Sequence, residues 1–196
     1  MTFSEFKFCV LADLYRLDGQ VSKSKLLKEI LFGEAFKFLF WFRVCNWSRS
    51  TITLKYTLYP VARIVFNHYT YKFGISIPIG TQIDAGFYIG HFGCIIVNPE
   101  CKIGKNVNIS HGVTLGQANR GERRGSPSIG DNVYIAPGAK IIGKIKIGNN
   151  VAIGANSVVT KDIEDNAVVV GIPGKVISSN GANDYVALTD YMDKIA

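Results

Sequence analysis

The chain has 196 residues, 47% of them hydrophobic, which is enough for one or two domains with a sizeable core. Its formal net charge of +7 is uneven, since residues 1–74 hold 11 Lys and Arg against 5 Asp and Glu, whereas residues 75–196 hold 11 against 10. The excess favours an anionic partner, but no nucleic-acid recognition motif accompanies it, which argues against a nucleic-acid-binding protein. Four cysteines form no CxxC pair and no signal peptide precedes them, so we expect a cytoplasmic protein with reduced thiols.

The N-terminal 74 residues are predicted to form an α-helical domain. Cap and turn residues set the limits of four helices: 4–17 with Ser4 as N-cap, 22 or 24 to 31 with Gly33 after it, 34–47, and 51–73 with a bend at Pro60 and Gly74 at its end. The third helix is apolar on nearly every side and too short to cross a bilayer, which needs about 20 apolar residues. Two interpretations remain open and are compatible. The helices cover the open end of a neighbouring domain and pack against copies of themselves, or they also lie on an anionic membrane surface.

An aliphatic residue recurs at every sixth position through most of the stretch between residues 77 and 160. The series is Ile77, Ile83, Ile89, Ile95, Ile103, Ile109, Leu115, Ile129, Ile135, Ile141, Ile147, Ile153 and Val159. It skips eight residues after Ile95 and fourteen after Leu115. This period fits neither a helix nor simple strand alternation. It fits short strands joined by tight turns, three to a coil, and so predicts a solenoid whose aliphatic rows stack along a common axis.

These repeats, written Ile-Gly-x-x-Val/Ala/Ser-x, resemble the hexapeptide-repeat acyltransferases. Four segments are similar to serine acetyltransferases in particular: 106–116, 134–143, 151–159 and 170–175. The resemblance implies a left-handed parallel β-helix over residues 75–176, with the α-helical domain of residues 1–74 before it and a C-terminal tail of residues 177–196 after it. It also implies a homotrimer that uses acetyl-CoA as co-substrate and no metal. Within these limits we expect a last strand at 167–170 and a short helix at 185–195.

The skip after Leu115 inserts a polar, basic loop at residues 117–126. A coil that tolerates such an insertion places it outward, and loops on rigid scaffolds often carry binding groups. We therefore predict a functional loop that projects from the solenoid, in line with the related enzymes, whose loop closes over a neighbouring subunit's site.

The chain has only three histidines, which limits the candidates for a catalytic base. His68, near the end of the fourth helix, is expected to be structural or on the surface. His91 and His111 lie in coils outside the buried aliphatic positions, so both could face a groove. Histidine is the usual general base near neutral pH. Aligned without a gap, His91 falls on the catalytic histidine that the resemblance implies, and His111 falls on a groove-lining or acceptor-contacting position.

Three departures from the serine acetyltransferase pattern weaken the match on substrate. Gly90 and Ser76 stand where that family has two Asp residues, and Gly125 with Ser126 stands where it has an Arg-His pair that binds the serine carboxylate. A carboxylate normally fixes the tautomer of a catalytic histidine. The sequence offers three substitutes and no basis for a choice among them: Asp84, Glu100 and Glu122.

The remaining candidates come from the resemblance or, for the arginines and lysines, from a positive charge that could bind an anion. Residues expected to contact the acceptor, besides His111, are Asn98, Arg120, Arg123 and Arg124. Residues expected to contact coenzyme A are Gln117, Ala136, Pro137, Gly154 and Ala155, with Lys161 and Lys175 for its phosphates. Cys94 is predicted to be a small buried hydrophobe rather than a nucleophile. A zinc site is rejected, because the three histidines are too far apart in the sequence.

Together these features predict an acetyl-CoA-dependent O-acetyltransferase with His91 as base. Because a prism has flat faces and ligand sites are concave, the site should lie between columns of a closed trimer. The aromatic, basic helices favour an acceptor near the inner face of a membrane, such as a sugar hydroxyl of a surface polysaccharide or its lipid-linked precursor. Two alternatives remain open: a serine O-acetyltransferase of cysteine biosynthesis, and a non-catalytic trimeric scaffold.

Overall fold

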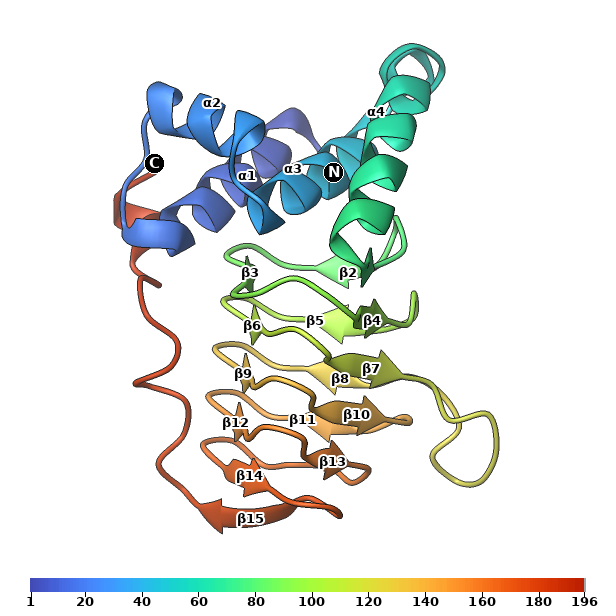
Figure 1. Cartoon of the computed structure of the whole chain (residues 1–196), viewed down its shortest axis with the longest axis vertical. Coiled ribbons are helices and arrows are strands. Elements are labelled where there is room, and N and C mark those ends of the chain that lie inside the picture. The colour runs from blue at the N-terminus through green and yellow to red at the C-terminus, as the bar shows by residue number, and fades with distance from the viewer. Residues whose placement is uncertain (196) are drawn as a thin grey trace.

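A column of short strands, capped at one end by four helices, makes up the computed structural model, which describes residues 1–195 (Figure 1). The helices are α1 (Phe3–Asp18), α2 (Lys23–Leu31), α3 (Ala35–Ser48) and α4 (Ile52–Phe73). The column begins immediately after α4, at Ile75. The predicted order of a helical region followed by a solenoid is therefore confirmed.

Three sheets form the sides of the column. Sheet A holds β1 (Ile75–Ser76), β4 (Ile95–Val97), β7 (Thr114–Gly116), β10 (Lys140–Ile142) and β13 (Val158–Val159). Sheet B holds β2 (Gln82–Ile83), β5 (Lys102–Ile103), β8 (Ser128–Ile129) and β11 (Lys146–Ile147). Sheet C holds β3 (Tyr88–Ile89), β6 (Asn108–Ile109), β9 (Tyr134–Ile135), β12 (Ala152–Ile153), β14 (Val168–Val170) and β15 (Lys175–Ser178). All named pairs are parallel except β14 with β15, so the chain is a parallel β-helix with three strands to a coil.

The aliphatic series forms the core of the column, as the period of six predicts. All thirteen residues of the series are buried, none more than 7% exposed. Their register is direct: Ile83 pairs with Ile103, Ile103 with Ile129, and Ile129 with Ile147. Each coil thus buries its aliphatic row against the next one, which is the main source of hydrophobic stabilisation in a solenoid.

Three edges join the sheets, and they decide where functional side chains can lie. Edge AB holds the turns after the sheet A strands, edge BC the turns after the sheet B strands, and edge CA the turns after the sheet C strands. Edge BC repeats an asparagine with positive φ, at Asn106, Asn132, Asn150 and Asn166. Asparagine tolerates this left-handed conformation. The loop of residues 117–126 leaves edge AB and projects from the column, as predicted (Figure 1).

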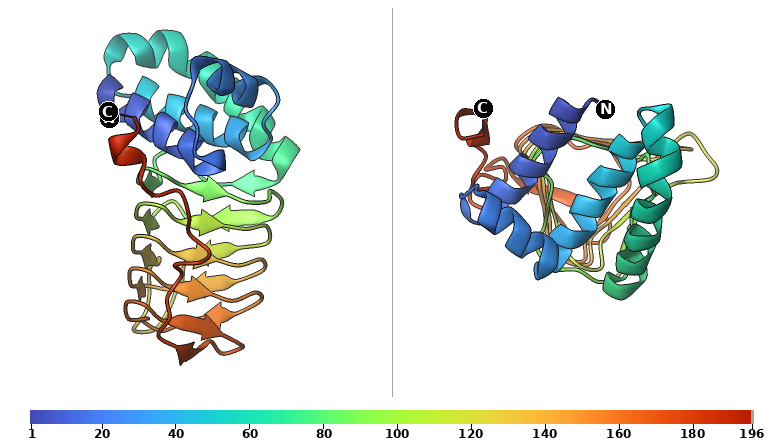
Figure 2. Two further views of the ribbon diagram at one scale, coloured as in Figure 1. Left: turned by 90° about the vertical axis from the view of Figure 1, so that its left-hand side faces the viewer. Right: turned by 90° about the horizontal axis from the view of Figure 1, so that it is seen from above.

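The helix ends follow local capping, with small departures from the sequence prediction. Thr2, not Ser4, is the N-cap of α1, because Thr2 and Glu5 form a capping box. Ser22 caps α2, and Thr51 and Gly74 bound α4 as predicted. The third helix lies one residue later than expected. Pro60 lies within α4, which changes direction along its length (Figure 2).

A buried ion pair joins the helices to the first coil. The Arg43 Nε of α3 lies 2.9 Å from Oδ2 of Asp13 in α1, and both residues are 1% exposed. Arg43 Nη2 also donates to the carbonyl oxygen of Asp84, and Asp13 Oδ1 accepts from the amide of Phe87 at 2.9 Å. One continuous apolar cluster runs from α3 and α4 through every coil. The helical region and the column therefore share a core.

The C-terminal tail does not form the predicted helix at 185–195. Among the described tail residues, 177–195, only Tyr191–Asp193 is helical, as the 3₁₀ turn η1, and residue 196 lies outside the described part. The tail runs back along the column to the helices (Figures 1 and 2). Tyr185 stacks on Tyr134 of sheet C with ring centroids 4.6 Å apart, and Tyr191 is buried against α1. Its apolar side chains pack on two distant surfaces, which a single helical face could not reach.

Candidate active site

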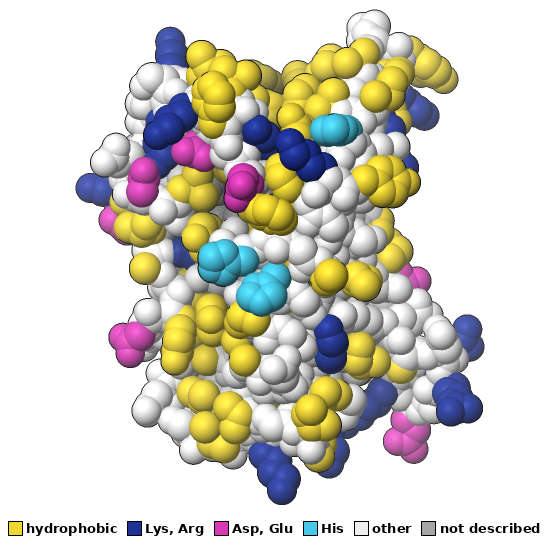
Figure 3. Space-filling model, in the orientation of Figure 1, with side chains coloured by type: hydrophobic (Ala, Val, Ile, Leu, Met, Phe, Trp, Pro, Cys, Tyr) yellow, Lys and Arg dark blue, Asp and Glu magenta, His cyan; other side chains and the backbone are white. Residues whose placement is uncertain are grey.

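His91 and His111 occupy edge CA on consecutive coils. His91 follows β3 and His111 follows β6, whose Ile89 and Ile109 are paired in register. The two ring centroids are 6.0 Å apart, with the ring planes inclined at 69°. Both side chains are exposed, and they lie side by side on the face shown in Figure 3. The prediction that both histidines lie outside the core is confirmed, and the two imidazoles can act on one ligand.

A cavity of about 340 Å³ lies between His91 and the helices. The first coil contributes residues 88–92, and the helical region contributes Leu17, Glu29, Glu34, Ala35 and Phe36. Phe92 also contacts Phe73 at the end of α4, with ring centroids 5.0 Å apart. The helices thus form a roof over one side of His91, so His91 faces a concave surface within a single chain.

The acidic residues near His91 are not the three that the sequence offered. Asp84 lies on edge BC, Glu100 on edge AB and Glu122 in the projecting loop, and none of them lines the His91 cavity. Glu29 and Glu34 line it instead. No local motif could reveal them, because more than fifty residues separate them from His91 and only the packing of the helices on the first coil brings them there.

Gly90 leaves open space beside His91. A Cβ added at Gly90 would have one neighbour within 4 Å, Cε1 of Tyr88 at 3.5 Å. Position 90, where the resemblance implies Asp, therefore has no carboxylate, and no other group fills the space that the Asp side chain would occupy. A carboxylate from elsewhere, or a bound ligand, has room there.

Small residues continue edge CA beyond His111. Ala136 and Pro137 follow β9, and Gly154 and Ala155 follow β12, so the structure places these four predicted cofactor contacts on the same edge as the histidines. A Cβ at Gly154 would lie 2.8 Å from Cγ1 of Val170, so packing within the column already requires glycine there. Lys175 pairs with Val170 at the last coil and lies near the far end of this edge.

The other predicted contacts lie on edge AB and in the projecting loop. Asn98 Nδ2 donates to Gln117 Oε1 at 3.2 Å, and Ser126 Oγ donates to Asn98 Oδ1 at 2.9 Å. Lys161 also lies on this edge, and Arg123 pairs with Asp162 at 3.6 Å. Arg120 and Arg124 are exposed in the loop. Since sheet A separates edge AB from edge CA, one chain does not bring the two groups of candidates together.

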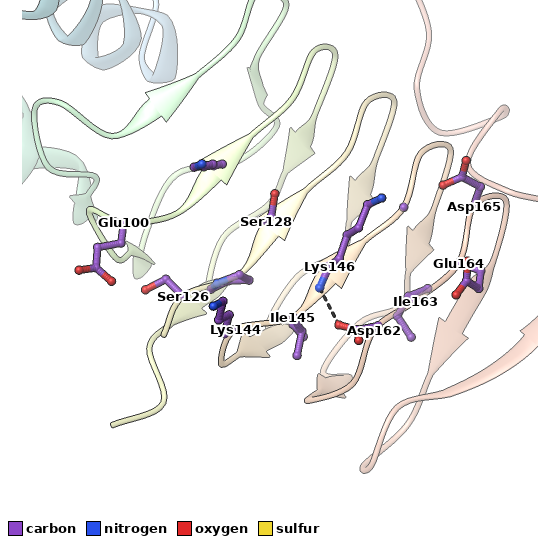
Figure 4. Close-up of a pocket in the computed structure, with 13 residues that line it drawn as sticks. Glu100, Ser126, Ser128, Lys144, Ile145, Lys146, Asp162, Ile163, Glu164 and Asp165 are labelled. Carbon is purple, nitrogen blue, oxygen red and sulfur yellow. Dashed lines mark hydrogen bonds between the residues drawn. The ribbon is translucent and has the colours of Figure 1, made fainter. Parts of the chain in front are cut away.

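A larger hollow of about 600 Å³ lies on the outer face of sheet B (Figure 4). Lysines and acids line it, among them Lys144, Lys146 and Asp162, whose Oδ1 accepts a hydrogen bond from the Lys146 amide at 2.8 Å. It contains no histidine and none of the small-residue edge. We therefore place the candidate site at edge CA, where the smaller cavity holds a general base.

Two further sequence predictions are decided by burial. Cys94 is exposed and adopts a left-handed backbone with φ of 54°, so its prediction as a buried hydrophobe is wrong. The turn before β4 directs it outward, away from the aliphatic series. His68 is exposed on α4 beside Tyr69, as predicted. Across residues 1–195 no group of three His, Cys, Asp or Glu side chains is arranged to hold a metal ion.

The chain is a parallel β-helix with His91 and His111 on edge CA, and comparison with known proteins shows which family of transferases has this architecture. The family described as bacterial transferase hexapeptide (six repeats) matches residues 126–161. The structure superimposes on that of serine acetyltransferase from Neisseria gonorrhoeae with a TM-score of 0.69 and 30% identity, over 90% of this chain and 68% of that one. The chain belongs to the bacterial hexapeptide-repeat transferases. This relationship implies a left-handed coil.

Relatives of this chain within that family include serine acetyltransferases. The chain is 42% identical to the serine acetyltransferase of Staphylococcus xylosus over 123 residues, which is 63% of this chain and 57% of the relative. It also resembles the structure of serine acetyltransferase from Brucella abortus in complex with coenzyme A, with a TM-score of 0.70 and 26% identity over 91% of this chain and 68% of that one. The chain thus spans less than two thirds of the length of the curated relatives it matches.

Proposed function

We propose that the protein transfers an acetyl group from acetyl-CoA to a hydroxyl group, with His91 as general base. The main support for this proposal is that His91 and His111 are exposed side by side on edge CA, and that small residues follow them along the same edge. His91 takes the proton from the acceptor hydroxyl as its oxygen attacks the thioester carbonyl. The C–S bond then breaks, and the sulfur of coenzyme A leaves with the proton that His91 returns.

L-serine is the acceptor that the homologues favour. The relatives are named serine acetyltransferases, and one neighbouring structure is described as a complex with serine. Purified protein is incubated with acetyl-CoA and millimolar L-serine, and free thiol and O-acetylserine are measured together. Formation of both products in equal amounts is expected, whereas no thiol release above that of the buffer would reject serine as acceptor.

A sugar hydroxyl is the second candidate, and one observation favours it. Gly125 and Ser126 carry no cation where the resemblance implies a carboxylate clamp, and Ser126 bonds to Asn98 instead. Arg120 and Arg124 of the loop are exposed and could replace the clamp, whereas Arg123 pairs with Asp162. If surface glycans lose an acetyl group in cells with His91→Gln while serine is not acetylated in vitro, the acceptor is a glycan.

The predicted site residues lie on two different edges of the column, which supports an active site formed between two copies of the chain. Histidines and small residues lie on edge CA, whereas Asn98, Gln117 and the projecting loop lie on edge AB. In a closed trimer arranged so that edge CA of one column faces edge AB of the next, each of three clefts receives both groups. We therefore propose a homotrimer with the projecting loop acting across the interface.

Subunit complementation tests this arrangement. Trimers mixed from a His91→Gln chain and a chain lacking residues 118–125 should recover about one quarter of the wild-type activity, because a quarter of randomly formed clefts pair an intact histidine with an intact loop. Each variant alone should be inactive. Failure of the mixture to exceed the single variants would place the complete site within one chain.

A further inference from the structure

We propose that the outer face of α4 docks the protein on the surface of an anionic phospholipid bilayer. Four large apolar side chains on this helix are exposed: Ile52 and Ile64, 73% and 71%, and Tyr56 and Tyr71, 71% and 84%. Pro60, also exposed, lies between them at the same four-residue spacing as Ile52, Tyr56 and Ile64. This spacing places them along one side of the helix. Hydrophobic side chains gather over α4 in Figure 3.

The opposite side of α4 already has a partner. Ala62, Phe66 and Phe73 are buried, and Phe66 packs on Phe38 of α3 with ring centroids 5.1 Å apart. The helix therefore carries two apolar faces, of which the fold covers one. An uncovered apolar face of this length on a helix is a mark of an interaction surface. None of the helices in residues 1–195 is long and apolar enough to cross a membrane, so the contact is with a surface.

The charges around this face indicate what covers it. Residues 35–83 contain six Lys and Arg and no Asp or Glu. Three of the six lie on α4 itself, namely Lys55, Arg63 and Lys72. Arg43 is buried in its ion pair with Asp13 and does not contribute to this surface. A surface that combines apolar side chains with cations and lacks anions matches the headgroup region of an anionic bilayer.

A second copy of the chain fits this face less well. Two α4 helices in contact would bring Lys55, Arg63 and Lys72 of each copy close to those of the other, and α4 offers no acid to pair with them. Like charges at an interface cost several kcal/mol against association. Charge complementarity thus favours phospholipid over self-association.

An aromatic cluster adjoins the start of α4. Phe6 stacks on Trp47 with ring centroids 4.9 Å apart, and Phe3 lies 5.4 Å from Trp47. Phe3 and Trp47, together with Leu54, line an open cleft of about 480 Å³. Rings of this kind settle at the boundary between headgroups and acyl chains. These rings lie beside the N-terminal end of α4 and so add to its apolar face at that end.

Docking through α4 would leave the candidate site close to the lipid. The end of α4 reaches the first coil, where Phe73 contacts Phe92, the neighbour of His91. Among the coils, the one that carries His91 is the nearest to the helices (Figure 1). An acceptor presented at a bilayer surface would therefore meet His91 before any other part of edge CA. The docking itself does not depend on the proposed acetyl transfer.

Vesicle co-sedimentation tests the proposal without any substrate. The full chain is mixed with vesicles of phosphatidylcholine alone or with about one third phosphatidylglycerol, and we expect binding to the second kind only. Replacement of Lys55, Arg63 and Lys72 by Gln should lower the partition coefficient by about 100-fold, at roughly fivefold for each basic residue. The double variant Tyr56→Ser/Ile64→Ser should also abolish binding.

A matched control removes three charges elsewhere. Lys102, Lys144 and Lys146 lie on the sheet B side, and their replacement by Gln gives the same net charge while leaving vesicle binding unchanged. Circular dichroism confirms that each variant folds. Equal binding by the α4 charge variant and this control, or equal binding to both kinds of vesicle, overturns the proposal. So does a drop in oligomer mass in Tyr56→Ser/Ile64→Ser, because it assigns the face to contact between copies.

Discussion

His91 and His111 lie one above the other on edge CA, with their ring centroids 6.0 Å apart, although twenty residues separate them in the sequence. One regular coil accounts for eighteen of these residues, and the remaining two are the extra residues in the turn between Ile95 and Ile103. Both histidines follow paired isoleucines, Ile89 and Ile109, by two positions. The first skip in the series therefore keeps the two imidazoles aligned.

Glu34 is predicted to orient His91. It is exposed in the His91 cavity, whereas an oxygen of Glu29, which lines the same cavity, lies against Gly33. Glu34→Gln should lower kcat by roughly 10- to 100-fold with little change in KM for acetyl-CoA, since a group that orients a reactive side chain acts mainly on the chemical step.

The control for Glu34 lies in the same cavity. Glu29→Gln removes the same charge and should leave kcat near the wild-type value. The ¹⁵N chemical shifts of the imidazole report its tautomer, which Glu34→Gln should change and Glu29→Gln should not. An unaltered tautomer in Glu34→Gln would show that this carboxylate does not orient His91.

Breaking the buried ion pair should loosen the helical region from the column. Asp13→Leu leaves the Arg43 guanidinium buried without its partner, which costs about 3–5 kcal/mol of unfolding free energy. Chemical denaturation measures this loss. The double variant Asp13→Leu/Arg43→Met should recover most of it, and a double variant as unstable as the single one would mean that the pair itself, rather than the orphaned charge, stabilises the junction.

The tail should contribute to stability through Tyr191. This side chain is 2% exposed and packs against Tyr15 and Phe8 of α1. Tyr191→Ala should cost about 3–5 kcal/mol, as for other buried aromatic residues. Tyr185, which is 57% exposed, serves as the comparison and should cost less on truncation. Equal losses at the two positions would contradict the packing described here.

The four thiols should differ in reactivity. Burial raises the pKa of Cys45 and of Cys101 to about 11, so both remain protonated near neutral pH and react slowly. Cys94 is exposed. Mass spectrometry after brief treatment with iodoacetamide at neutral pH should find Cys94 modified first. Faster modification of Cys101 than of Cys94 would contradict the structure.

The regular part of the molecule was predictable because each coil repeats one local rule. The aliphatic series and both skips located the strands and the projecting loop from sequence alone. Contacts between distant segments were not predictable. The path of the tail depends on Tyr185 meeting Tyr134 and on Tyr191 meeting α1, and the carboxylates beside His91 come from the helical region.

The candidate site was predictable in part, for the same reason. His91, His111 and the small residues fall on one edge because they share a position in the repeat. By the same rule Asn98 and Gln117 belong to another edge, because they follow Ile95 and Leu115, which occupy a different position in the three-strand coil. Cys94 was expected in the core because free cysteine is among the most often buried residue types, whereas here the turn before Ile95 exposes it.

Thiol release from acetyl-CoA by His91→Gln, compared with His68→Gln, tests the proposed role of His91 most directly. The imidazole of His68 lies on α4, outside the His91 cavity, so this variant should match the wild type. His91→Gln should lose 10²- to 10⁴-fold in kcat, as expected for removal of a general base, and should retain acetyl-CoA binding in calorimetry. A His91→Gln protein that releases thiol at the wild-type rate would contradict the assignment of His91 as the base.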